Sequence, residues 1–264
     1  MAKAKKAERL IFKLGWVPDI PDARDVLYAA PAKVLKKLPS KVNLSTKFPA
    51  LYDQGELGSC TACAIGGAFQ FLQKKQKLKD FIPSRLFIYY NERVVLGTIN
   101  EDSGAMIRDG IKSMNKQGAC QETMWPYKIE KFTQKPPKEC YKEALKHQVT
   151  SYKRLSQNLS QLQGCLADGF PFVFGFTVYD SFMTQAVAKT GKMPMPDLSK
   201  ESVLGGHAVV AVGYDDSIQC VIVRNSWGKN WGKGGHFMMP YAYIQNPSLC
   251  DDFWTMRIIE PQAG

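Results

Sequence analysis

The chain has 264 residues, of which 45% are hydrophobic and 22% are charged, a composition that supports one globular domain or two small ones. No apolar run reaches the roughly 18 residues that span a membrane, and the basic N-terminus lacks the apolar core and cleavage site of a signal peptide. The seven cysteines are an odd number without a dense disulfide framework. These features exclude a helical membrane protein and predict a cytoplasmic protein.

The net charge of +11 is unevenly distributed. The first 50 residues hold 11 Lys and Arg against 4 Asp and Glu, so +7 of the net charge lies there. Such a basic leader could contact nucleic acid or an acidic surface, or it could be a solvated tail that keeps the protein soluble. The sequence leaves both interpretations open.

Residues 1–40 are interpreted as a leader in front of a globular body. Residues 1–14 are a Lys-rich amphipathic stretch, whereas residues 15–39 contain four prolines and three aspartates. Proline fixes φ and removes a hydrogen-bond donor. The second part of the leader is therefore predicted to be extended.

The first half of the body is predicted to be helical. Apolar residues at helical spacing predict helices over residues 60–79, 83–96 and 103–114. Pro83 stands at the start of the second helix, where its missing N–H is harmless. Residues 41–145 are therefore interpreted as a helical lobe.

The second half changes to the period of two that is typical of strands. After a short helix near residues 157–168, apolar segments bounded by Gly, Pro and Asp predict five strands, over residues 171–180, 207–216, 219–225, 234–240 and 252–260. The prediction is an antiparallel, barrel-like sheet in a β-rich lobe of residues 146–264. Helices followed by strands indicate an α+β protein, in which residues 41–264 form one domain of two lobes around a cleft.

Cys60 follows the turn residues Gly55 and Gly58 and begins the first predicted helix. There its sulfur would face unpaired backbone N–H groups and the positive end of the helix dipole, both of which favour the thiolate. The thiolate is the nucleophilic form of cysteine. Cys60 is therefore the candidate nucleophile, and a buried structural cysteine is the alternative.

A nucleophile of this kind needs a base, and the chain has three histidines. His147 and His236 have no motif around them, whereas His207 follows two glycines and begins a predicted strand, HAVVAVGYDD. Asn225 ends the next predicted strand and could accept a hydrogen bond from one ring nitrogen of His207. That bond would fix the tautomer whose other nitrogen faces the sulfur.

Four separated segments together resemble the papain-like cysteine peptidases: QGELGSC at 54–60, WPY at 125–127, GHAVVAVGY at 206–214 and NSWGKNWGKGG at 225–235. Cysteine, histidine and asparagine stand in the order of that family, with spacings of 147 and 18 residues. The resemblance covers roughly residues 38–260. It is strongest to a bacterial and viral subgroup with the pattern LGSCTA and a short leader.

The resemblance implies a cysteine peptidase with a papain-like two-lobe fold, which hydrolyses a peptide or protein substrate and needs no cofactor or metal. Cys60 would attack the peptide carbonyl, and His207 would protonate the leaving amine before water releases the acyl-enzyme. Gln54 and the backbone N–H of Cys60 would form the oxyanion hole. Trp227 would cover the hydrogen bond between His207 and Asn225.

The same resemblance implies a substrate-binding set whose members line the cleft: Gly104, Ala105, Met106, Ile107, Gly205, Gly206 and Trp227. The first two fall where the family pairs with the substrate backbone, and the next two fall at the wall of the S2 pocket. Apolar walls predict an apolar or bulky P2 side chain.

Two positions depart from the family pattern. Thr61 stands where papain and its animal relatives have tryptophan after the nucleophile, and Leu57 stands where they have a half-cystine. The long helical prodomain of the secreted relatives is not expected either, since fewer than 60 residues precede Cys60. These changes affect leaving-group binding and a disulfide, but they remove no catalytic group.

Other functions have weaker support. The spacing from Cys60 to Cys63 is that of thioredoxin-type oxidoreductases, although the predicted helices do not supply the required βαβ context. A non-catalytic binding protein on the same scaffold would have no physical need for the complete catalytic set. No group of Cys and His has zinc-ligand spacing.

The leader suggests a further hypothesis. Its prolines preset the extended backbone that a peptide cleft accepts, and the resemblance implies that such segments lie along the active site. Residues 16–25 are predicted to cover the Cys60 cleft and restrain activity until displaced or cut, with Trp16 or Ile20 filling a pocket. The alternative is a strap packed on the back of the helical lobe.

Overall fold

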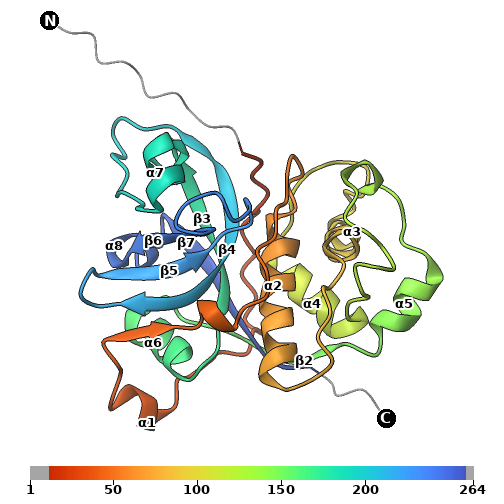
Figure 1. Cartoon of the computed structure of the whole chain (residues 1–264), viewed down its shortest axis with the longest axis horizontal. Coiled ribbons are helices and arrows are strands. Elements are labelled where there is room, and N and C mark those ends of the chain that lie inside the picture. The colour runs from red at the N-terminus through yellow and green to blue at the C-terminus, as the bar shows by residue number, and fades with distance from the viewer. Residues whose placement is uncertain (1–11, 260–264) are drawn as a thin grey trace, which may run out of the picture.

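The computed structural model of the protein describes residues 12–259. Most of the Lys-rich stretch at residues 1–14, and with it the predicted contact with nucleic acid or an acidic surface, lies outside the described residues. Figure 1 shows helices on one side, a sheet on the other, and the N-terminal segment running between them.

The helical lobe contains α2 (Cys60–Lys75), α3 (Arg85–Leu96), α4 (Ile107–Gln117) and α5 (Lys138–Ala144). The predicted start of α2 at Cys60 is confirmed, whereas its predicted end at Lys79 is four residues too late. α3 begins after Ser84, whose hydroxyl accepts from the N–H of Phe87, so Pro83 precedes the helix and does not form its first turn. No helix of residues 12–259 is long and apolar enough to cross a membrane.

In the described residues, seven strands form one antiparallel sheet: β1 (Lys41–Asn43), β2 (Val149–Arg154), β3 (Phe172–Tyr179), β4 (Val203–Asp215), β5 (Cys220–Arg224), β6 (His236–Pro240) and β7 (Cys250–Ile259). The strand order is β2-β7-β3-β4-β5-β6, and β1 pairs with β4. The five predicted strands are confirmed as β3 to β7. β1 and β2 carry too few apolar residues to be recognised from sequence, and β1 places residues 41–43 in the sheet.

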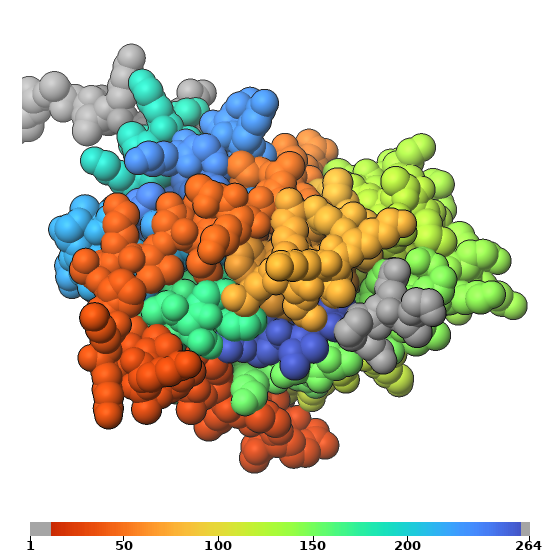
Figure 2. Space-filling view, turned by 60° about the horizontal axis from the view of Figure 1, so that its bottom comes forward, coloured from red at the N-terminus to blue at the C-terminus, as the bar shows by residue number. Residues whose placement is uncertain are grey.

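Short helices fill the connections: α1 (Ala32–Leu35), α6 (Leu159–Ala167), α7 (Gln185–Thr190), α8 (Tyr241–Ile244) and three 3₁₀ turns at Ser45–Lys47, Ile129–Lys131 and Asp180–Met183. α6 confirms the predicted short helix. α1 corrects the expectation that residues 15–39 are extended throughout, because Pro31 caps one helical turn there. Figure 2 shows this part of the leader, in red and orange, beside α6 in green.

α2 packs against β4 and joins the two lobes (Figure 1). Its residues 60–73 are all buried, which fits a segment that is mostly apolar and whose few polar side chains include Thr61, Gln70 and Gln73. The N-terminus of α2 carries Cys60, and β4 carries His207. The contact between these two elements therefore positions the candidate site.

Candidate active site

Cys60 lies where the N-terminus of α2 meets β4. Its sulfur accepts a hydrogen bond from the backbone N–H of Ala208 at 3.4 Å. Ala208 follows His207 in β4, which is held on both sides by pairing with β3 and β5. The fold therefore brings the predicted nucleophile to the strand that carries the predicted base, across 147 residues of sequence.

Asn225 orients the imidazole of His207. The Nε2 atom of His207 lies 2.8 Å from Oδ1 of Asn225, and this oxygen also accepts from the N–H of Ser226. Because Oδ1 is an acceptor, Nε2 carries the proton. The other ring nitrogen, Nδ1, is buried without a hydrogen-bond partner among the described residues. The tautomer thus leaves Nδ1 free to take a proton.

Trp227 covers the imidazole. Its ring stacks on that of His207 with centroids 4.6 Å apart and an interplanar angle of 24°. The ring of Phe12 also stacks on Trp227, with centroids 4.3 Å apart and an interplanar angle of 7°. These rings exclude water from the hydrogen bond between His207 and Asn225.

Gln54 is buried, and its side chain is fixed at both ends. Its Oε1 accepts from the hydroxyl of Ser226 at 2.6 Å, which leaves Nε2 to donate. Nε2 donates to the carbonyl of Leu57 at 2.9 Å and to the carbonyl of Lys13 at 3.2 Å. A fixed amide donor that already holds a peptide carbonyl is the arrangement an oxyanion hole requires.

The backbone of residues 15–17 pairs with Ala105 and Gly206. The N–H groups of Gly15 and Trp16 donate to the carbonyl of Gly206 at 3.0 and 2.9 Å. Ala105 accepts from Val17 at 3.0 Å and donates to Gly15 at 2.8 Å, which makes a parallel bridge with Trp16. Ala105, predicted to pair with the substrate backbone, and Gly206, predicted to face the S2 pocket, are thus paired with the chain's own N-terminal segment.

The other members of the predicted substrate-binding set lie nearby. A Cβ on Gly104 would lie 2.2 Å from the Gly15 carbonyl oxygen, and a Cβ on Gly205 would touch the side chain of Leu14. Met106 caps α4 and is half-buried, whereas Ile107 is fully buried in the core. Gly104 thus leaves room for the leader backbone, and Gly205 leaves room for the Leu14 side chain.

Trp16 fills a recess lined by two glycines. A Cβ on Gly175 would lie 2.0 Å from Cε2 of Trp16, and a Cβ on Gly206 would lie 2.7 Å from Cε3. Trp16 is 8% exposed, whereas Ile20 is 67% exposed. The prediction that Ile20 could be the anchor is therefore wrong, because its side chain faces solvent. From the sequence, Gly175 is recognisable only as a glycine inside a predicted strand. Such a glycine indicates that another group packs closely against the strand, but it does not identify that group as Trp16.

Burial shifts the pKa values of both Cys60 and His207 toward the neutral thiol and the neutral imidazole. Burial raises the pKa of the Cys60 thiol to about 12, although the Ala208 N–H opposes this shift. Burial also lowers the pKa of His207 to about 4, although Asn225 opposes it. The expectation of a thiolate at the helix N-terminus is wrong for this covered state, since the favourable N–H groups do not offset the loss of water.

Thr61, the residue after Cys60, is hydrogen-bonded to a buried carboxyl group. Its hydroxyl donates to Oε2 of Glu92 in α3 at 2.7 Å. Glu92 is completely buried, and burial raises its pKa to about 8. This hydrogen bond ties α2 to α3 at the position where relatives of papain have tryptophan.

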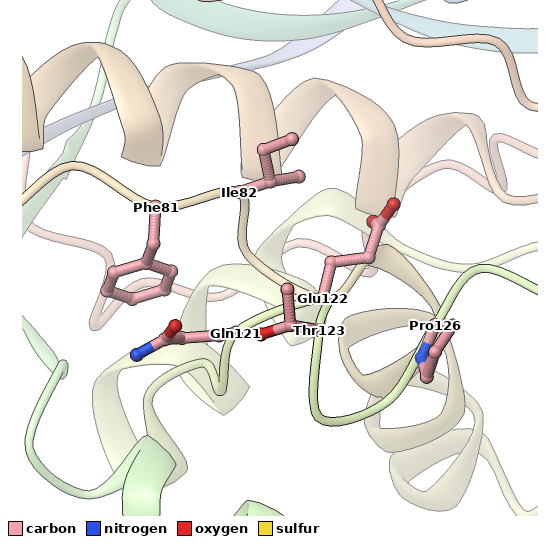
Figure 3. A pocket seen from close by; sticks show the side chains of 6 residues that line it. All are labelled: Phe81, Ile82, Gln121, Glu122, Thr123 and Pro126. Carbon is pink, nitrogen blue, oxygen red and sulfur yellow. The ribbon is translucent and has the colours of Figure 1, made fainter.

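Figure 3 shows a surface pocket on the helical lobe. Its lining residues are Phe81, Ile82, Gln121, Glu122, Thr123 and Pro126. Glu122 pairs with Arg85 at 2.7 Å, and Arg85 donates to the carbonyl of Asp53 at 3.1 Å. The ion pair at the rim of this pocket therefore supports the residue next to Gln54.

The geometry agrees with comparisons to known proteins. Residues 38–250 match the family model described as papain family cysteine protease. An uncharacterised peptidase C1-like protein of Acanthamoeba polyphaga mimivirus is 43% identical over 268 residues, which cover 92% of this chain and 86% of the viral protein.

Solved structures give the same result. Xylellain, a cysteine protease from Xylella fastidiosa, is 44% identical, with a TM-score of 0.89 over 97% of this chain and 99% of its own. A procathepsin B of Trypanosoma congolense, 16% identical, has a TM-score of 0.73 over 93% of this chain and 87% of its own. The predicted papain-like fold is thereby confirmed. This chain belongs to the papain family of cysteine proteases.

Proposed function

We propose that Cys60, His207, Asn225 and Gln54 are the catalytic groups of this cysteine peptidase. The observation that carries the assignment is the 2.8 Å contact between His207 Nε2 and Asn225 Oδ1, since it leaves Nδ1 as the base. The N–H of the next residue, Ala208, donates to the Cys60 sulfur, so the base and the nucleophile meet at the same point of β4. Nothing comparable supports an oxidoreductase: Cys60 and Cys63 are both buried in one helix, and neither is in a disulfide.

The reaction proceeds through an acyl-enzyme. Cys60 transfers its proton to Nδ1 of His207, and the sulfur attacks the peptide carbonyl. Gln54 Nε2 and the Cys60 N–H stabilise the oxyanion, and Nδ1–H then protonates the leaving amine. His207 next takes a proton from water, which attacks the thioester and releases the acid.

We further propose that the N-terminal segment from Phe12 to Asp19 occupies the substrate cleft and holds the enzyme in a zymogen-like state. Support comes from the backbone pairing with Ala105 and Gly206 and from the Lys13 carbonyl at Gln54. The segment also excludes water, and burial keeps the thiol and the imidazole neutral. The proposed inhibition therefore combines occupancy with suppression of the ion pair.

Trp16→Ala in the full chain tests both proposals. Removal of the indole is expected to raise hydrolysis of a fluorogenic dipeptide and iodoacetamide labelling of Cys60 by about tenfold or more. Ile20→Ala is the matched control, because that side chain is exposed and its loss is expected to change neither rate. Equal rates for both variants and the parent chain would rule out inhibition by the leader.

Peptide mapping of the labelled protein separates the catalytic assignment from the inhibition. Cys60 is expected to react faster than the other six cysteines in Trp16→Ala, and Cys60→Ser should abolish hydrolysis. If another cysteine reacts faster, or if Cys60→Ser keeps its activity, the catalytic assignment is wrong whatever the leader does.

We also infer a cytoplasmic location and membership in a bacterial and viral subgroup. All seven cysteines are free, which fits a reducing compartment, and the mimivirus and Xylella relatives have similar length. Fractionation of expressing cells tests the location: recovery outside the cytoplasmic fraction would contradict it.

A further inference from the structure

A polar cluster beyond the Trp16 recess links the leader to the body. Two tryptophans and two aspartates exchange hydrogen bonds across this contact: Trp16 Nε1 donates to Asp252 Oδ2 at 3.0 Å, and Trp254 Nε1 donates to Asp19 Oδ2 at 2.8 Å. Trp254 and Asp252 are 1% and 0% exposed, and Asp19 is 8% exposed. This cluster plays no part in the catalytic mechanism.

The body contacts both the backbone and the side chain of Asp19. The Asp19 N–H donates to Asp252 Oδ2 at 2.7 Å. The carboxylate of Asp19 accepts two hydrogen bonds from the body. Oδ2 accepts from the Trp254 indole, and Oδ1 accepts from the backbone N–H of Arg108 at 3.0 Å. Each polar atom that distinguishes an aspartyl residue thus has a partner in the body.

The Arg108 N–H is an orphan donor of α4. Arg108 is the second residue of this 11-residue helix, and the N-cap residue Met106 provides no side-chain acceptor. The carboxylate of Asp19 takes the place of the missing cap. The buried Trp254 indole provides a second and independent donor at the same carboxylate.

Charge and backbone geometry also suit a carboxylate here. Burial raises the pKa of Asp19 overall, whereas its hydrogen bonds from the Arg108 N–H and the Trp254 indole, and the charges of Arg108 and Arg154, favour the ionised form. Arg154 also lies 3.2 Å from Asp252, which offsets the repulsion between the two carboxylates. Asp252 has a φ of +59°, in the left-handed region, so the backbone is held in a costly conformation that presents this acceptor.

We propose that Arg108, Trp254 and Asp252 form an aspartyl-binding subsite, which recognises the N–H and the carboxylate of one aspartate in an extended peptide. The peptide places a large apolar side chain three residues before that aspartate, in the recess lined by Gly175 and Gly206. The leader is the tethered occupant, and an external peptide of the same pattern competes with it. The proposal rests on the proposed function, because it requires that the cleft accepts peptides.

Asparagine and glutamate do not satisfy the subsite. An asparagine side chain has one acceptor oxygen, so its NH₂ group would face either the indole N–H or the Arg108 N–H. Glutamate places its carboxylate one methylene farther from the backbone N–H that Asp252 binds. Selectivity for aspartate over asparagine is therefore the signature of the subsite.

Peptide binding to a full-length variant tests the proposal. The protein carries Cys60→Ser to prevent turnover, and Trp16→Ala with Asp19→Ala to weaken its own leader. Fluorescence anisotropy measures the Kd of a labelled peptide of residues 15–26, GWVPDIPDARDV. The same peptide is compared with its Asp19→Asn form and with its Asp22→Asn form.

The Asp19→Asn peptide is expected to bind about tenfold or more weakly, because one of the two hydrogen bonds is lost and the other is no longer charge-assisted. Asp22→Asn removes the same charge from a residue that pairs with Arg24 inside the peptide and lies 3.6 Å from Lys112 and 3.9 Å from Arg108 at the surface of the body. Because these longer ion pairs are solvated, it is expected to weaken binding by less than about threefold. Trp254→Phe in the body should reduce the preference for aspartate, since one of two donors is gone.

Equal affinity for the parent and Asp19→Asn peptides would overturn the subsite, and so would failure of every peptide to bind. Neither outcome depends on turnover. Failure of the proposed function would instead appear as a Trp16→Ala enzyme without Cys60-dependent hydrolysis, so the two failures are distinguishable.

Discussion

The side-chain amide of Gln54 donates a hydrogen bond to the backbone carbonyl of Lys13 at 3.2 Å. The donor proposed for the oxyanion of a substrate thus holds a peptide carbonyl of the chain itself. This contact relates the leader directly to the proposed chemistry, because a substrate carbonyl must take the place of the Lys13 carbonyl. The catalytic predictions below therefore refer to the Trp16→Ala background, in which the cleft is expected to be more accessible.

Gln54→Glu should lower kcat by about 10² to 10³-fold, the usual cost of losing one oxyanion donor. A carboxylate keeps an oxygen that accepts from Ser226, but it removes the N–H group that points at the carbonyl. Steady-state hydrolysis of a fluorogenic dipeptide measures the effect, and circular dichroism checks the fold. A variant with nearly full kcat would exclude Gln54 as the donor.

Asn225→Ala should lower kcat by about a hundredfold, because the imidazole loses the acceptor that fixes its tautomer. Asn225→Asp is the matched control, since a carboxylate still accepts from Nε2, and it should retain more activity. The melting temperature shows whether the loss reflects unfolding. If the alanine and aspartate variants have the same kcat, the hydrogen bond between residue 225 and His207 does not contribute to catalysis by orienting the imidazole.

Gly175→Ala should narrow the apolar recess, since a Cβ there would lie 2.0 Å from the Trp16 ring. We expect kcat/KM for a substrate with Phe at P2 to fall by about tenfold or more relative to one with Ala at P2, because overpacking costs about 1 to 3 kcal/mol. The ratio of the two kcat/KM values is the measurement. An unchanged ratio would show that this recess does not receive the P2 side chain.

Glu92→Gln should remove a pH dependence of stability. Burial raises the pKa of Glu92 from 4.5 to about 8, so the folded state favours the protonated form. The stability contribution of this group is complete below about pH 4.5, decreases as the pH rises toward 8, and is lost above it. Glutamine mimics the neutral acid, so the variant should be more stable than the parent at pH 8, by up to about 4 kcal/mol, and similar at pH 5.

Urea unfolding at both pH values measures this difference. Thr61→Val provides a second check, because it removes the hydroxyl that donates a hydrogen bond to the Glu92 carboxyl group. This variant should destabilise the protein most at high pH, where Glu92 is ionised and needs the donor. A Glu92→Gln variant that is no more stable than the parent at pH 8 would contradict the prediction.

Local patterns made the elements and the order of the catalytic residues predictable. Cys60 follows a turn and begins an uninterrupted apolar helix, and the strand that begins near His207 has an uninterrupted apolar run, so spacing alone located α2 and β4. β1 and β2 lack such a pattern. β1 has only three residues and β2 contains charged residues, and each pairs with a strand, β4 or β7, that supplies most of the buried side chains.

Features that depend on long-range contacts could not be predicted in the same way. The proline spacing gives an extended leader, but it does not say whether Trp16 or Ile20 faces the body. The ionisation of Cys60 depends on burial by a segment more than 40 residues earlier, not only on the helix that it begins. Asp252 contacts Asp19 across 233 residues, and no local signal marks either as a partner.

Covalent attachment determines how tightly the leader must bind. A segment linked by a short connection experiences an effective concentration on the order of millimolar, so an intrinsic Kd of about 10 μM would keep it bound about 99% of the time. The same peptide detached in dilute solution would dissociate. Val26 and Leu27, in the connection, are 61% and 66% exposed. A single cleavage there would leave the cleft contacts of residues 12–19 intact, and under the proposed inhibition dilution alone would then release the active enzyme.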